Sequence, residues 1–312
     1  MLTIISQSII GIIDLGAAFL FMYGLKRMSS PVTAPSGIKL AGIGMAAAVI
    51  ASFLYALNVD AAAKPQLAVN LGLSLIALVL GGGIAWWAGR KVAMTAMPQM
   101  VAVYNGMGGG AAAAIAAVEL FGNKADGVTQ IVVTLFGALI GAVSLSGSLI
   151  AWAKLDEILR KPLRFPGQQI LNGLVALVTL AIGGYIVAAT HGRVTSPVAT
   201  PQLIYIFFGA ALLFGVLMTM PIGGADMPVV ISIYNAFTGL AVGLEGFVLQ
   251  NPALMIAGMV VGGRHAVDAV DGEGDEPFGQ QYPVHELRYG RPAEAGRDQG
   301  QPETGRSERC GD

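Results

Sequence analysis

The chain has 312 residues, of which 54% are hydrophobic and 12% charged, whereas soluble domains average about a quarter charged residues. This composition excludes an ordinary soluble globular protein. Eighteen Lys and Arg against 19 Asp and Glu leave a net charge of −1, which excludes a basic nucleic-acid-binding surface. One cysteine and three histidines argue against a disulfide framework, and we expect no metal site.

Nine apolar runs in chain order predict membrane helices, since a span needs about 20 predominantly apolar residues to cross the hydrocarbon layer. They cover residues 5–24, 38–58, 67–89, 97–121, 128–152, 168–190, 202–220, 227–249 and 253–263, the last too short as it stands. The first run lacks a basic n-region and a cleavage site, so we expect a retained helix rather than a signal peptide. The predicted fold is an all-α, polytopic transmembrane bundle of about nine helices.

The distribution of charge divides the chain in two. Residues 1–263 carry 12 Lys and Arg and 8 Asp and Glu, while residues 264–312 carry 6 and 11. The first part is predicted to be the transmembrane domain. The second part, rich in Gly, Glu, Arg and Gln, cannot bury a core and is predicted to be a disordered polar tail.

Basic residues predict the orientation, because short loops rich in Lys and Arg stay on the cytoplasmic side. Three basic residues fall in one set of alternate loops, and nine fall in the other: Lys26, Arg27, Lys39, Arg90, Lys91, Lys154, Arg160, Lys161 and Arg164. We therefore expect a periplasmic N-terminus and a cytoplasmic C-terminus.

An internal repeat links two of the predicted helices. The segment MPQMVAVYNGMGG at 97–109 matches MPVVISIYNAFTG at 227–239. Each opens with a proline suited to a first helical turn and places an asparagine two turns in, at Asn105 and Asn235. An Asn in hydrocarbon must find hydrogen-bond partners, so the pair predicts either a water-lined path or hydrogen bonds that only hold helices together.

Three acidic residues lie inside predicted spans, where an unpaired charge costs about 2.5–3.5 kcal/mol at the bilayer centre. Asp14 lies near mid-span, whereas Glu119 and Glu245 lie near the outer ends of their helices, where solvation at the interface is the alternative explanation. We treat all three as candidates for a proton path. Asp226, directly before the second repeat helix, is either a helix cap or part of a mobile joint with the preceding Gly223-Gly224 pair.

A stripe of small residues marks the run at 128–152. Gly137, Gly141, Ser144 and Ser148 lie on one helical face, which lets another helix backbone approach closely. We expect this stripe to serve packing.

The segment MPQMVAVYNGMGGGAAA at 97–113, and above all GGADMPVVISIYNAFTGLA at 223–241, resemble the beta subunit of proton-translocating NAD(P) transhydrogenase. The resemblance covers about residues 1–263. It implies an enzyme of the bacterial inner membrane that couples hydride transfer between NADH and NADP to proton translocation, with an NAD-binding alpha subunit and a dimer of alpha–beta units. It also implies that Asn105 and Asn235 lie on channel helices and Asp226 at the cytosolic mouth.

The family continues past the last span into an NADP-binding domain, which residues 264–312 do not resemble. NADP(H) and NAD(H) are therefore implied for the intact enzyme, and we expect this chain alone to bind neither and to catalyse no hydride transfer. The string GRHAVDAVDGEGDEPF, written in GC-rich codons and read one nucleotide later, can encode AGTLLTLLMAKAMNRS, which would complete an apolar helix. We hypothesise an out-of-frame tail; a genuine short tail is the alternative.

Two other functions stay open from the residues alone. One is a secondary transporter or channel for another small solute, with the repeated polar helices lining a site at mid-membrane. The other is a membrane scaffold whose polar residues only join helices.

Overall fold

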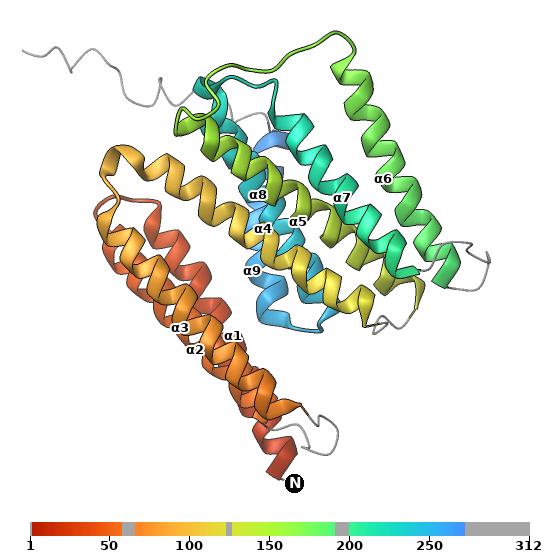
Figure 1. Ribbon diagram of the computed structural model, residues 1–312. Helices are drawn as coiled ribbons and strands as arrows, with labels where there is room; N and C mark the ends of the chain where they lie inside the picture. The colour runs from red at the N-terminus through yellow and green to blue at the C-terminus, as the bar shows by residue number, and fades with distance from the viewer. Residues whose placement is uncertain (1, 58–65, 123–126, 191–199, 272–312) are drawn as a thin grey trace, which may run out of the picture. The chain divides into compact units, whose positions relative to one another are not determined.

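The computed structural model describes residues 2–57, 66–122, 127–190 and 200–271, and its regular elements there are all helices. Figure 1 shows them as α1 to α9. Their bounds are Leu2–Met28 (α1), Ala34–Leu57 (α2), Leu67–Lys91 (α3), Met97–Phe121 (α4), Val128–Leu155 (α5), Gln168–Thr190 (α6), Thr200–Thr219 (α7), Met227–Val248 (α8) and Pro252–Asp271 (α9). Helices α1 to α8 are long and apolar enough to cross a membrane.

The predicted all-α architecture is confirmed, and the predicted runs at 97–121 and 168–190 coincide with α4 and α6. Helix α9 runs to Asp271 and so continues past residue 263, the end of the last predicted apolar run. The predicted boundary of the transmembrane domain at residue 263 stays a prediction. We predicted that residues 264–312 form a disordered tail or an out-of-frame product. Residues 272–312 lie outside the described part of the chain, so both interpretations stay predictions.

Helix α5 is the central helix of the part formed by α4 to α8. It contacts α4, α7 and α8, and more narrowly α6. Figure 1 shows α4, α5 and α8 crossing near one another. A Cβ atom added to Gly109 of α4 would lie 3.0 Å from the carbonyl oxygen of Gly141 in α5, so the two backbones approach closely. All four residues of the predicted stripe are buried, and Gly141, Ser144 and Ser148 pack against α4, as predicted for membrane helices that associate through small residues.

Helices α8 and α9 meet through glycines in the same way. A Cβ atom on Gly239 would come within 2.6 Å of the backbone nitrogen of Gly262, and one on Gly258 would overlap the backbone of Gly243. Through these close approaches α9 packs on α8, which in turn contacts α5.

The first three helices differ from this group in how much they bury. Helix α1 packs on α2, where a Cβ atom on Gly37 would lie 2.7 Å from the carbonyl oxygen of Gly24. Helix α3 has no buried residue along its length. At its C-terminal end the Arg90 guanidinium lies 4.5 Å from the centre of the Trp86 ring, and the Lys91 ammonium lies 4.4 Å from that of Trp87. Aromatic and basic side chains gathered at one helix end are typical of a membrane interface.

Candidate functional site

The sequence repeat is also a structural repeat at the start of α4 and α8. Each helix is preceded by one 3-10 turn, Met94–Ala96 before α4 and Gly224–Asp226 before α8. Each then opens with a proline in its first turn, where the missing N–H breaks no helical hydrogen bond. Two segments far apart in sequence therefore enter the helical group through the same local geometry.

A chain of polar contacts joins α4, α5 and α8, and we call its four residues Asn105, Ser144, Ser148 and Thr238 the polar seam. The Nδ2 atom of Asn105 donates to the Ser148 hydroxyl at 3.0 Å, and the Thr238 hydroxyl donates to the Asn105 carbonyl oxygen at 3.3 Å. The hydroxyls of Ser144 and Thr238 are 2.6 Å apart, and Ser144 also donates to the Tyr234 carbonyl oxygen at 3.0 Å. The seam thus crosses all three helices.

Asn105 is 8% exposed, and its side-chain oxygen is a buried acceptor that no donor within the described ranges reaches. An unsatisfied buried acceptor is costly, and a polar site of this kind is where an ordered water contributes most. Asn105 can therefore hold one hydroxyl and offer its oxygen to a water.

The structure does not bring Asn235 to the polar seam. Asn235 is exposed on α8, and the preceding Tyr234 takes the buried position, with 1% exposure and its hydroxyl 2.5 Å from that of Thr219 in α7. On α4 the arrangement is reversed, since Asn105 is buried and Tyr104 exposed. The same Tyr-Asn pair thus presents a different residue to the interior in each copy.

A buried lysine at the end of α5 was missed by sequence reasoning. Lys154 is 5% exposed, and its ammonium donates to the carbonyl oxygens of Thr219 at 2.9 Å, Met220 at 2.6 Å and Ile222 at 2.5 Å. These carbonyls belong to the end of α7 and the segment after it, where a cation satisfies groups that the helix leaves unpaired. The signal was present in the sequence, because Lys154 lies only two residues after the end of the apolar run at 128–152.

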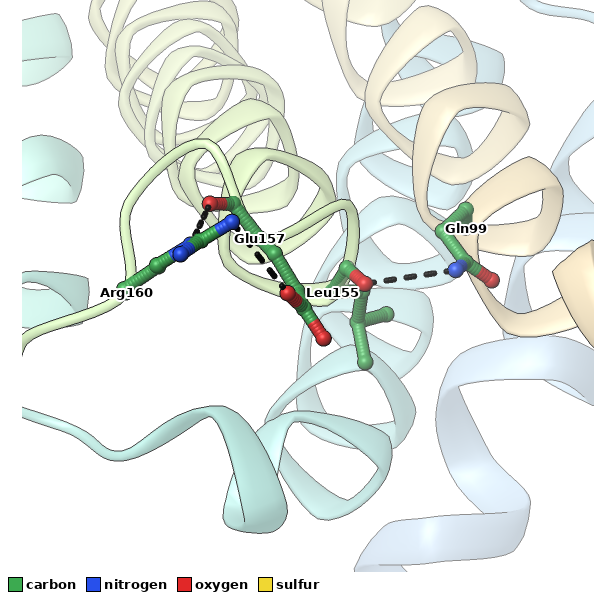
Figure 2. A network of polar contacts seen from close by, with 4 residues as sticks. All are labelled: Gln99, Leu155, Glu157 and Arg160. Carbon is green, nitrogen blue, oxygen red and sulfur yellow. Dashed lines mark hydrogen bonds and ion pairs between the residues drawn. The ribbon is translucent and has the colours of Figure 1, made fainter.

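An open cavity of about 420 Å³ lies beside this lysine and is lined by Lys154, Leu155, Glu157, Arg160 and Gly224. Figure 2 shows the polar contacts of three of these residues, Leu155, Glu157 and Arg160. The Arg160 guanidinium pairs with the Glu157 carboxylate at 3.7 Å, and the Gln99 amide of α4 donates to the Leu155 carbonyl oxygen at 3.3 Å. The starts of α4 and α8 and the end of α5 therefore meet at one end of the helical group.

Asp226 lies at this same end and is exposed. It occupies the N-cap position of α8, as one of the two predicted alternatives had it, but its side chain makes no capping hydrogen bond. The carboxylate still lies at the positive end of the helix dipole and stays available to solvent.

The opposite end of these helices holds two buried acids. Glu245 of α8 is 0% exposed and Glu119 of α4 is 9% exposed, and the two interact electrostatically. Neither carboxylate oxygen of Glu245 has a hydrogen-bond partner among the described residues. Asp14 lies on α1, half-buried, and α1 packs mainly on α2. The parts of the chain that the structure describes hold no group of three or more His, Cys, Asp or Glu that could bind a metal ion.

These features define a multi-pass membrane protein with a polar seam between three helices and buried acids toward one end of it. The family model described as NAD(P) transhydrogenase beta subunit matches residues 10–266, and the chain belongs to this family. The chain is 34% identical over 260 residues to the NAD(P) transhydrogenase subunit beta of Rhodospirillum rubrum, and equally to that of Rhodospirillum rubrum strain ATCC 11170. The matches cover 80% of this chain, and the chain spans about half the length of these relatives, 52%.

Proposed function

We propose that this chain forms the proton-conducting membrane part of a transhydrogenase, in which hydride transfer between NADH and NADP is coupled to proton translocation. The observation that carries the proposal is the polar seam, which lies buried between α4, α5 and α8 of a chain that belongs to the beta-subunit family. Polar groups buried at membrane depth cost free energy. Where they are found in membrane proteins, they mark ion pathways.

The residues of the polar seam suit the ordering of a proton wire. Each hydroxyl of Ser144, Ser148 and Thr238 can donate one hydrogen bond and accept another, and it can rotate between partners. Asn105 cannot titrate, so its role in the proposal is to orient a water through its free side-chain oxygen. Asn235 would contribute from the exposed face of α8.

The cytoplasmic end of the path is proposed to be the end that holds Lys154 and Asp226. The excess of Lys and Arg in one set of alternate loops supports this orientation, with a periplasmic N-terminus and a cytoplasmic C-terminus. Asp226 at the exposed start of α8 and the open cavity beside it would face the part of the enzyme that binds nucleotide.

The nucleotides enter this proposal only through other parts of the enzyme. The described residues form helices alone and offer no strand–turn–helix unit for a dinucleotide phosphate. NADP(H) and NAD(H) supply the hydride chemistry when bound elsewhere, and the partner we propose is an NAD-binding alpha subunit, in a dimer of alpha–beta units in the bacterial inner membrane.

Proton movement measured together with hydride transfer tests the function. Residues 1–266 would be joined to the unmatched remainder of the Rhodospirillum rubrum beta subunit, combined with an alpha subunit and placed in lipid vesicles. We expect hydride transfer to be accompanied by a change of lumenal pH that a protonophore abolishes. Hydride transfer with no pH change would overturn the proposal. Uptake of another small solute without nucleotide would instead identify a secondary transporter.

A further inference from the structure

The Glu245 carboxylate lies near the end of α8 that is far from Lys154, in a space left open by Gly137. A Cβ atom on Gly137 of α5 would overlap its Oε1 atom, so the carboxylate fits only because residue 137 has no side chain. The Gln130 amide donates to the Val248 carbonyl oxygen at 3.3 Å and joins the start of α5 to the end of α8 just beyond. The carboxylate is thus held between two helices in a closed position, about one helical turn, or about 5 Å, from the helix end.

Among the residues whose side chains the structure describes, none offers this carboxylate a counter-charge. Glu119 is the titratable residue that faces it from α4, and it carries the same charge when ionised. The ionisable residue of α5 is Lys154, at the far end of that helix, and residues 252–263 of α9 carry none. With no described donor to its oxygens, an ionised Glu245 would lose its hydration without compensation, which costs several kcal/mol.

A proton is the ligand that best fits a buried carboxylate without hydrogen-bond donors or a counter-charge among the described residues. A proton on the Glu245 carboxylate removes the uncompensated buried charge and gives the side chain an O–H donor. A metal ion needs more oxygen ligands than two carboxylates supply, and the described residues hold no larger cluster of acids.

We propose that Glu245 binds a single exchangeable proton in the space opened by Gly137, with Glu119 as the neighbouring group through which that proton exchanges with the outer face. In this exchange the O–H bond of Glu245 breaks as one forms on an oxygen of ionised Glu119, and the negative charge passes from Glu119 to Glu245. Where a water accepts the proton instead, a hydronium ion forms and Glu245 is left with the negative charge. The use of this proton in translocation rests on the proposed function, whereas the binding site itself does not.

Infrared difference spectroscopy of the whole chain in lipid bilayers tests the site directly. A protonated carboxyl in a dry environment gives a carbonyl stretch separate from that of carboxylates, and the band shifts in D2O when the proton exchanges. We expect a band that titrates with pH and is lost in Glu245→Gln, while Asp156→Asn, at an exposed position after α5, leaves it unchanged. Glu119→Gln should retain the band and shift the pH at which it titrates.

Glycine variants supply a second, independent readout. Gly137→Ala should displace the carboxylate and broaden or shift the band, whereas Gly184→Ala, where an added Cβ meets no atom within 4 Å, should leave the band unchanged. The proposal is overturned by a band that survives in Glu245→Gln, by the absence of any titrating band in the unmodified chain, or by loss of the band on adding sodium ions at constant pH, which would indicate a cation site.

Failure of the site and failure of the proposed function have different signatures. If hydride transfer moves no protons but the band behaves as expected, the proton site stands and the function is wrong. If protons are pumped at the normal ratio by Glu245→Gln, the site takes no part in translocation. With the proposed function and the site both correct, we expect at least a tenfold loss of proton pumping in Glu245→Gln.

Discussion

The group formed by α4, α5 and α8 has a buried ionisable side chain at each end, and the two side chains differ in their hydrogen-bond partners. At one end Lys154 donates to three carbonyl oxygens, and at the other the two oxygens of Glu245 meet no donor within the described residues. Both side chains are almost completely buried. We infer from this difference that Lys154 is a cation that stabilises the fold, whereas Glu245 is an acid that binds an exchangeable proton. A buried group with all its hydrogen bonds is held in place, and a buried group without partners gains most from binding a ligand.

Replacing Lys154 and Glu245 in turn by methionine tests this comparison directly. We expect the larger change in the free energy of unfolding at Lys154. Lys154→Met leaves the carbonyls of Thr219, Met220 and Ile222 without their cation, and we expect a loss of about 3 kcal/mol in the free energy of unfolding. Unfolding by sodium dodecyl sulfate in mixed micelles measures it. An unchanged midpoint would show that the lysine contributes nothing to the fold.

The glycine contact between α4 and α5 should give the next largest effect. In Gly109→Ala the added Cβ atom would lie 2.9 Å from that of Ser144, and we expect a loss of about 2 kcal/mol from overpacking. Gly81→Ala on the exposed helix α3, where nothing lies within 4 Å, is the control and should not lose stability. Equal losses in the two variants would mean that the close approach is not what holds these helices together.

At Glu245 the same apolar replacement should act in the opposite direction. Glu245→Met removes a buried carboxyl that has no described partner, and we expect the free energy of unfolding to rise by about 1 kcal/mol in the same micelle assay. A loss comparable to that of Lys154→Met would break the comparison, because it would show that Glu245 is held by contacts that stabilise the fold.

The polar seam should contribute least to stability. Asn105→Ala removes the hydrogen bond to Ser148, and such bonds between membrane helices average about 0.6 kcal/mol. Asn235→Ala, on the exposed face of α8, is the matched change and should leave unfolding unaltered. A loss of several kcal/mol for Asn105→Ala would favour the scaffold role over the proton path.

Most of the fold could be predicted because membrane helices are recognisable in the sequence as long apolar runs. For α4 and α6 the predicted first and last residues are those of the structure. The packing of the stripe on α5 was also predictable, since small residues three or four positions apart on one helical face let another membrane helix approach closely. The end of α9 was not, because Asp268 and Asp271 break the apolar pattern while the backbone continues as a helix.

The site was only partly predictable for a different reason. The repeat correctly identified α4 and α8 as equivalent helices, but the rotation of each helix about its axis depends on its neighbours, so Asn105 and Tyr234 became the buried members of the two pairs. The Lys154 contacts depend on the chain after α7, and the space for Glu245 depends on Gly137, more than one hundred residues before it in sequence. Contacts of this range leave no local pattern to interpret.

The most direct test of the account measures hydride transfer and lumenal pH together in vesicles that contain residues 1–266 joined to the remainder of a related beta subunit and combined with an alpha subunit. The account predicts that the two signals start together, and that Glu245→Gln lowers the pH signal while the hydride-transfer activity of uncoupled vesicles persists. Hydride transfer at full rate with no pH signal in the unmodified chain would contradict it.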